Sequence, residues 1–279
     1  VECMKILFLG DIVGRSGREL VVSRLPELRQ KLRPDFIIVN GENAAGGYGI
    51  TREICKSLYD GGVDVITLGN HAWDQRDSWG YIDEEKRILR PANYPSNVPG
   101  QGAGVYELSD GRKILVIQLM CRLFMDPLDD PFSKLEEILS GRNLGVKDSG
   151  GLGLAAIVLD LHGEASSEKQ SLARFADSRV SAVLGTHTHV PTADNIVLPG
   201  GTAYMTDVGM CGPYDSVIGM DPVIAMNRFV RKLPTERLKP VTGDSSICGA
   251  LIETNDLTGL AKSISPVRLG GILDQSIPV

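Results

Sequence analysis

Cysteine is scarce in this chain and is never paired in the sequence. The five cysteines are far apart and form no CxxC motif, so zinc sites built from cysteine pairs are excluded. A disulfide framework is not expected either, because the number is odd and the spacing irregular. A reducing compartment, the cytoplasm, is therefore favoured. The five residues are Cys3, Cys55, Cys121, Cys211 and Cys248.

Long apolar runs and an excess of basic charge are also lacking. No stretch of about 18 apolar residues is present, so no transmembrane helix is predicted. The first residues show no signal-peptide pattern, and residues 1–3 are expected to be an upstream extension or a cloning remnant before Met4. The formal net charge of −6 argues against a polyanion-binding surface. We expect a protein that neither enters a membrane nor binds nucleic acid directly.

Several common catalytic motifs are missing. Gly10, Gly14 and Gly17 are spaced somewhat like a nucleotide-binding loop, but neither GxGxxG nor GxxxxGK[ST] occurs. The GxSxG elbow of many esterases and the HExxH motif of many zinc proteases are absent as well. Dinucleotide binding, P-loop chemistry and these two hydrolytic chemistries are therefore not supported.

Apolar runs alternate with helical patterns in the first two thirds of the chain. Strands are predicted over residues 5–9, 36–40, 63–68, 113–119, 155–161, 180–184, 201–205, 247–253 and 261–267. Helices are predicted over residues 18–32, 52–60, 131–139 and 166–175. Pro26 implies that the first helix is kinked or begins near that residue.

This order predicts an α/β fold. Continuous apolar strands that alternate with helices indicate a parallel sheet covered on both faces. The alternation stops after about residue 190, which suggests a second, mixed or antiparallel sheet. Residues 72–104 contain both tryptophans and several prolines and glycines, and are expected to form a long loop region near the site. Since no linker or repeat is visible, residues 1–279 are expected to form one domain.

Metal-capable side chains follow five of the predicted strands. Each of the four histidines comes directly, or within a few residues, after an apolar run. In open α/β sheets, ligands bind beyond the carboxyl ends of the strands, so these side chains are expected to gather at one edge. The set consists of Asp11, Glu42, Asn43, Asn70, His71, His162, His187 and His189.

Each of these residues alone has an ordinary structural explanation. Asp11 could cap a helix, Asn70 could occupy a left-handed turn, and a single histidine is more often structural. His187 and His189 could be exposed loop residues, although two residues apart in extended backbone they would project from the same side. It is improbable that all of these separate explanations apply at once, and we predict a metal site instead.

The mixture of carboxylate, amide and imidazole side chains indicates which class of metal ion could bind. It fits hard to borderline divalent ions, with iron and manganese favoured and zinc as an alternative. There are enough ligands for two ions. A carboxylate that bridges two ions about 3.5–4 Å apart is the usual arrangement for phosphoester hydrolysis.

The order and spacing of these residues resemble the calcineurin-like metallophosphoesterases over residues 5–190. The matching motifs are Gly10-Asp11, Gly41-Glu42, Gly69-Asn70-His71, the single His162, and Gly185-Thr186-His187-Thr188-His189. Three positions depart from the family pattern. Val13 stands where the D-x-H motif has histidine, Asn43 follows Glu42 where GDxxD is usual, and Ala72 follows the histidine of the GNH motif.

These departures resemble the YmdB-type branch of bacterial phosphodiesterases. Residues 43–47, 161–165 and 207–210 add to this second resemblance. It implies a metallophosphoesterase-like α/β sandwich with two mixed β-sheets flanked by helices. The implied activity is a dinuclear-metal phosphodiesterase that hydrolyses small phosphodiesters, 2′,3′-cyclic nucleotides among them, by attack of metal-bound hydroxide on phosphorus.

The resemblance also implies a ligand for each position. The first metal would take Asp11, Glu42 and His189, with Asn43 near the place of the missing histidine, as a ligand or as a contact to substrate or water. The second metal would take Glu42, Asn70, His162 and His187, so that Glu42 bridges the two ions.

His71 would remain free of metal and act as general acid toward the leaving oxygen. Asp74 would orient it, or would instead cap a helix. The loop over residues 46–49 could bring backbone N–H groups to phosphate and place Tyr48 to stack a base; a flexible turn explains the same glycines.

Two other functions compete with a phosphodiesterase. One is a phosphomonoesterase or protein phosphatase of the same fold. The other is a metal-binding regulatory protein with little turnover, which the weakened ligand set at Val13 and Asn43 would suit. The sequence does not determine the oligomeric state, and a homo-oligomer is one of the possibilities.

Overall fold

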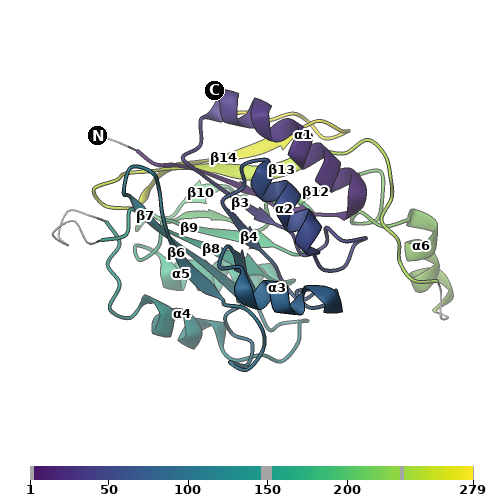
Figure 1. Ribbon diagram of the computed structural model, residues 1–279, viewed down its shortest axis with the longest axis horizontal. Helices are drawn as coiled ribbons and strands as arrows, with labels where there is room; N and C mark the ends of the chain where they lie inside the picture. The colour runs from purple at the N-terminus through teal and green to yellow at the C-terminus, as the bar shows by residue number, and fades with distance from the viewer. Residues whose placement is uncertain (1–2, 146–152, 233–235, 279) are drawn as a thin grey trace.

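Two six-stranded sheets lie face to face in the computed structural model, with helices on the outer faces (Figure 1). The structure describes residues 3–145, 153–232 and 236–278. The expected extension at residues 1–3 therefore lies largely outside the described residues. Within the described ranges no helix is long and apolar enough to cross a membrane.

The first sheet is mixed and has the order β14-β13-β1-β3-β4-β5. Its parallel strands are β1 (Lys5–Leu9), β3 (Phe36–Asn40), β4 (Val65–Thr67) and β5 (Ile88–Leu89). The two late strands β13 (Ile247–Thr254) and β14 (Ala261–Leu269) extend it in antiparallel pairing, with Leu7 opposite Leu251. The N-terminal and C-terminal parts of the chain therefore share one sheet.

The second sheet is also mixed and has the order β10-β11-β9-β8-β7-β6. Its parallel strands are β7 (Lys113–Met120), β8 (Ala156–His162), β9 (Ala182–Thr186) and β11 (Ala203–Met205). Antiparallel strands β6 (Ala103–Glu107) and β10 (Ile196–Val197) form the two edges. A separate two-stranded ribbon pairs β2 (Asp11–Ile12) with β12 (Met210–Cys211). Two mixed sheets flanked by helices confirm the predicted fold class. The expectation that the second sheet consists of the strands after residue 190 is wrong, because β7, β8 and β9 belong to it while β13 and β14 join the first sheet.

Six α-helices and one short 3₁₀ helix are described in these ranges. They are α1 (Gly14–Leu32), α2 (Arg52–Asp60), η1 (Arg76–Ser78), α3 (Trp79–Glu84), α4 (Pro131–Leu139), α5 (Ser166–Ala176) and α6 (Pro222–Arg231). In Figure 1, α1 and α2 lie on the outer face of the first sheet, α4 and α5 on that of the second, and α6 at one end of the molecule.

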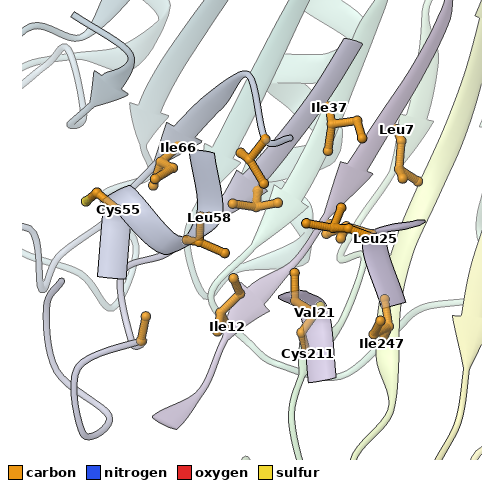
Figure 2. Close-up of a cluster of buried hydrophobic side chains, with 14 of the residues drawn as sticks. Leu7, Ile12, Val21, Leu25, Ile37, Cys55, Leu58, Ile66, Cys211 and Ile247 are labelled. Carbon is orange, nitrogen blue, oxygen red and sulfur yellow. The ribbon is translucent and has the colours of Figure 1, made fainter. Parts of the chain in front are cut away.

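The period-two alternation of the buried strands produces three apolar layers. In β1, Ile6 and Phe8 belong to the cluster between the sheets, whereas Leu7 and Leu9 pack toward α1 and α2. Figure 2 shows the outer cluster, in which Leu25 of α1 joins side chains of the strands. A third cluster lies between the second sheet and helices α4 and α5. The resulting order of layers is helix, sheet, sheet, helix.

The alternative that the first helix begins near Pro26 is wrong, because α1 runs from Gly14 to Leu32 with Pro26 inside it. Pro26 lies on the solvent side, while Val21, Leu25 and Leu28 on the opposite side are fully buried. Burying each such side chain contributes about 1.5–3 kcal/mol, which together exceeds the roughly 3 kcal/mol that an interior proline costs.

Residues 72–104 are not an unbroken loop. They include η1, α3, β5 and the beginning of β6. Ile82, Ile88 and Leu89 are almost fully buried, and the latter two belong to a strand that completes the edge of the first sheet. The prolines and glycines of this region obscured these short elements in the sequence.

Candidate metal centre

The predicted ligands meet where the carboxyl ends of both sheets come together. Two overlapping groups form there, one of Glu42, His162 and His187 and the other of Asp11, Glu42 and His189. Within each group, one potential ligand atom per residue lies within 4.8 Å of the others. Glu42 is common to both groups, which is the position that a bridging carboxylate requires.

Each residue is delivered by a strand end. Asp11 lies in β2 directly after β1, Glu42 follows β3, and Asn70 follows β4, so the first sheet contributes three side chains. The second sheet contributes His162 from the last position of β8, and His187 and His189 just after β9. Neither sheet alone would hold a complete set of ligands.

Glycine is required at one position in the turn after β4. A Cβ atom on Gly69 would lie 2.2 Å from Oε2 of Glu42 and 2.4 Å from Nε2 of His162. Both of these side chains are buried and fixed by other contacts. The missing side chain of Gly69 therefore leaves the space in which the ligand atoms converge.

One ring nitrogen of each histidine is bound outside the site, which leaves the other directed inward. Nδ1 of His189 lies 2.8 Å from the carbonyl oxygen of Ile218, so it donates and Nε2 faces the carboxylates. Nε2 of His187 lies 3.4 Å from Oε2 of Glu164, and Nδ1 faces the site. The hydrogen bond from His189 to Ile218 is of the kind that sets the tautomer and orientation of metal-binding histidines.

His162 is oriented by a chain of buried hydroxyl and carboxylate groups. The hydroxyl of Thr186 donates to Oδ1 of Asp160 at 2.6 Å and lies 2.9 Å from Nδ1 of His162. The ring therefore donates through Nδ1, and its Nε2 lies 3.1 Å from Glu42 and 2.9 Å from Oδ1 of Asn70. Asp160 and Thr186 are site-supporting residues that the sequence interpretation did not identify.

The buried carboxylates need a positive charge nearby to remain ionised. Burial raises the pKa of Asp11 to about 6, and its Oδ1 atom has no hydrogen-bond partner among the described residues. Burial also acts to raise the pKa of Glu42, but His162 outweighs it and holds that pKa below its ordinary value. Burial would lower the pKa of His162, yet Glu42 raises it to about 9. A divalent ion would supply the charge that these groups need.

The donor set fits metal ions. Carboxylate oxygens, imidazole nitrogens and one amide oxygen converge here, and such a mixed donor set suits divalent metal ions. The free Oδ1 of Asp11 and the space beside Gly69 are features that a hydrogen-bonded structural cluster would not need.

The extended backbone that would place His187 and His189 on the same side does not persist beyond β9. β9 ends at Thr186, and the two histidines have φ values of 99° and 67°, in the left-handed region. The N–H of His187 donates to Oδ2 of Asp11 at 3.2 Å, and that of Thr188 donates to Oδ2 of Asp207 at 3.0 Å. These contacts turn the backbone, and both rings still reach the site.

A buried ion pair between Lys169 and Asp207 stabilises this turn. Nζ of Lys169 in α5 lies 3.1 Å from Oδ2 of Asp207 and donates to the carbonyl of Thr186 at 2.7 Å. Both charged side chains are fully buried. Lys169 lies on the apolar stripe of α5 with Leu172 and Ala173, an anomaly that could have indicated its role in the sequence.

Asn43 lies beside the first group, and Val13 does not. Nδ2 of Asn43 is 3.1 Å from Oε1 of Glu42 and 3.0 Å from Nε2 of His189. Rotation of this amide by 180° would present its oxygen to the same place. Val13 is fully buried in an apolar cluster with Met210 and Met220, so the departure from the D-x-H motif is absorbed by packing.

His71 stands at the open side of the site. Its N–H donates to Oε2 of Glu42 at 3.2 Å, and its Nδ1 lies 2.9 Å from Oδ2 of Asp74. The side chain is 30% exposed, and its ring belongs to neither group of potential ligands. The ring is therefore accessible from solvent next to the two groups of potential ligands.

Known proteins are similar to this chain over almost its whole length. A family model described as a YmdB-like protein matches residues 7–267. The chain is 44% identical over 266 residues to the 2′,3′-cyclic-nucleotide 2′-phosphodiesterase of Bacillus subtilis strain 168, covering 95% of this chain and 97% of that protein.

Two solved structures are also similar. One is a hypothetical protein from Thermus thermophilus, with a TM-score of 0.86 and 39% identity over 96% of this chain and 100% of that one. The other is a novel phosphatase from Mycoplasma pneumoniae, with a TM-score of 0.88 and 32% identity over 96% of this chain and 94% of that one. With the family model extending across both sheets, this chain belongs to the YmdB-like protein family.

Proposed function

We propose that this protein is a metal-dependent phosphodiesterase that hydrolyses small phosphodiesters, with 2′,3′-cyclic nucleotides as substrates. The observation that carries the proposal is the inward-facing nitrogen of three histidines around two buried carboxylates. The activity named for the Bacillus relative agrees with it. Because the ligands come from both sheets, we propose that residues 1–279 act as one domain.

The residues divide between two ions. Asp11, Glu42 and His189 would hold the first, with Asn43 beside it, and Glu42, Asn70, His162 and His187 would hold the second. Two divalent ions at such sites polarise a phosphoryl group and lower the pKa of water, which supplies the nucleophile. Iron or manganese suits this set, with zinc as the alternative. The five free cysteines support a reducing compartment, the cytoplasm.

His71 acts as the general acid. Oδ2 of Asp74 lies 2.9 Å from Nδ1 of His71 and orients the ring. Nε2 then gives its proton to the leaving oxygen as the bond from that oxygen to phosphorus breaks. The N–H contact to Glu42 holds the His71 backbone next to the residue that both ions share.

The test compares three substrates with the purified protein. After loading with Mn²⁺ or Fe²⁺ and metal analysis, turnover is measured on adenosine 2′,3′-cyclic phosphate, bis-(p-nitrophenyl) phosphate and p-nitrophenyl phosphate. We expect the two diesters to be cleaved at least about tenfold more efficiently than the monoester. Preference for the monoester would favour a phosphomonoesterase, and no turnover with two ions bound would favour a regulatory protein.

A second test concerns the space beside Gly69. Gly69→Ala is expected to displace Glu42 and His162 and to lower metal affinity and turnover by about 10–100-fold, as disturbing the support of metal ligands commonly does. Metal analysis, circular dichroism and the diester assay measure the effect. Gly80→Ala in α3 is the matched control, because a Cβ there meets nothing within 4 Å. Equal losses in both variants would mean that the site does not depend on this space.

A further inference from the structure

Two side chains beside His71 have no part in the chemistry proposed above. The ring of Tyr48 meets the ring of His71 in an edge-on arrangement, with centroids 5.1 Å apart and planes at 86°. The guanidinium carbon of Arg237 lies over the Tyr48 ring, 4.6 Å from its centroid. An aromatic ring and a cation thus stand next to the proposed general acid.

Tyr48 is held by a rigid loop. Gly46, Gly47 and Gly49 have φ values of 62°, 88° and 74°, which glycine adopts without strain. The N–H of Ala45 donates to the carbonyl of Gly49 at 2.9 Å, and Nε2 of Gln75 donates to the carbonyl of Tyr48 at 2.7 Å. The backbone that carries the ring is therefore ordered before any ligand binds.

The segment that carries Arg237 is packed onto the same loop. A Cβ on Gly47 would lie 2.9 Å from side-chain atoms of both Met220 and Pro240, so the chain on either side of α6 closes over it. The segment before α6 also pairs with the one after it, since the N–H of Asp221 donates to the carbonyl of Lys239 at 2.9 Å. Arg237 thus lies three residues before Pro240, which packs on the loop that carries Tyr48.

Arg237 keeps its hydrogen-bonding capacity. Within the described ranges, its contact is the Tyr48 ring, and no carboxylate or carbonyl accepts from its guanidinium. A guanidinium stacked on a ring retains donors at its edge that match the oxygens of a phosphate. In a chain of net charge −6, this cation is suited to an anionic substrate.

We propose that Tyr48 and Arg237 form the subsite that recognises a nucleotide. The base stacks on the Tyr48 ring in place of the guanidinium, and the Arg237 side chain turns to the negatively charged phosphodiester. Tyr48 therefore selects substrates that carry a base, whereas Arg237 acts on any phosphodiester. The proposal rests on the proposed function, since it places the base beside the general acid.

The test of Tyr48 uses two cyclic diesters with the same five-membered ring. Adenosine 2′,3′-cyclic phosphate carries a base, and glycerol 1,2-cyclic phosphate does not. Tyr48→Ala is expected to raise KM for the nucleotide about tenfold, the size of a lost base–aromatic stack, and to leave KM for the glycerol diester unchanged. Tyr48→Phe keeps the ring and should keep the ratio of the two KM values.

The use of a ratio separates stacking from an effect on His71. If Tyr48 serves only to position His71, Tyr48→Ala lowers kcat for both diesters equally and the KM ratio does not move, which overturns the proposal for the base. A Tyr48→Phe variant whose ratio of KM values for the two diesters differs from that of the wild type would overturn it as well, because the stacking surface remains in that variant.

Arg237 is tested with the same pair of diesters. Arg237→Ala is expected to raise KM about tenfold for both, since a charge-assisted contact to the common phosphate is lost. Arg237→Lys should recover part of this loss, and Arg231→Ala on α6 is the matched control that removes a cation elsewhere. An unchanged KM for the glycerol diester in Arg237→Ala would overturn the anion contact.

Calorimetry distinguishes failure of this subsite from failure of the proposed function. Adenosine 3′-monophosphate and glycerol 1-phosphate are titrated into the wild type and the Tyr48→Ala variant, without any turnover. If the Tyr48→Ala variant binds adenosine 3′-monophosphate more weakly than the wild type but binds glycerol 1-phosphate equally well, the subsite is supported even if no diester is hydrolysed. Equal affinity of the two proteins for the nucleotide overturns the subsite even if the wild type hydrolyses every diester.

Discussion

Replacement of Glu42 by glutamine is expected to remove both metal ions and nearly all turnover. Loss of an outer hydrogen-bond partner of a metal ligand already costs about 10–100-fold, and the bridging carboxylate should cost more than that. The amide keeps the shape of the side chain but loses the charge that both groups of ligands share. Metal content per chain and kcat/KM on a cyclic nucleotide measure the result.

Two controls accompany this experiment. Glu53→Gln on the exposed part of α2 changes charge by the same amount away from the site and should leave metal content and turnover unchanged. Because Glu42 and His162 form a buried pair, the variant must also be tested for folding by circular dichroism and urea unfolding. A folded Glu42→Gln protein that keeps two ions would show that Glu42 is not the bridge.

His71→Ala is expected to keep both ions and to lower kcat on a cyclic nucleotide by about 10²–10⁴-fold, the usual contribution of a general acid. The loss should be much smaller on bis-(p-nitrophenyl) phosphate, because a nitrophenolate leaves without needing a proton. Asp74→Asn should produce a smaller loss in the same direction, since the ring remains but the contact that orients it is weakened.

The dependence of the loss on the leaving group distinguishes a catalytic role of His71 from a purely structural one. If His71 only packs against Tyr48, the loss in His71→Ala is the same for both substrates. Unchanged turnover on the cyclic nucleotide would remove His71 from the mechanism. Metal analysis of the variant is needed in both cases, because the His71 backbone contacts Glu42.

The sequence alone determined which residues would meet. Asp11, Glu42, Asn70 and His162 follow runs of apolar residues that could be recognised as buried strands by composition and length. Once such strands are parallel, their carboxyl ends share an edge, and the side chains that follow them must lie near one another. The predicted strand bounds differ from the observed ones by only a few residues, as with 180–184 against Ala182–Thr186.

The local geometry of the site required the tertiary structure. The left-handed backbone at His187 and His189 follows from hydrogen bonds to Asp11 and Asp207, which no local pattern indicates. The same holds for the helix α1 across Pro26, where distant packing outweighs the local preference of proline. In both cases the deciding contacts come from residues far away in the sequence.

The orientation of each ligand is likewise a tertiary property. Whether His162 presents Nε2 to Glu42 depends on Thr186 and Asp160, and the position of Arg237 over Tyr48 depends on how two loops pack. A sequence specifies which chemical groups follow which strand, because periodicity and composition are local. Which ring nitrogen or which face of a ring is presented is decided by contacts between segments that are far apart in the sequence, and only the folded chain brings these together.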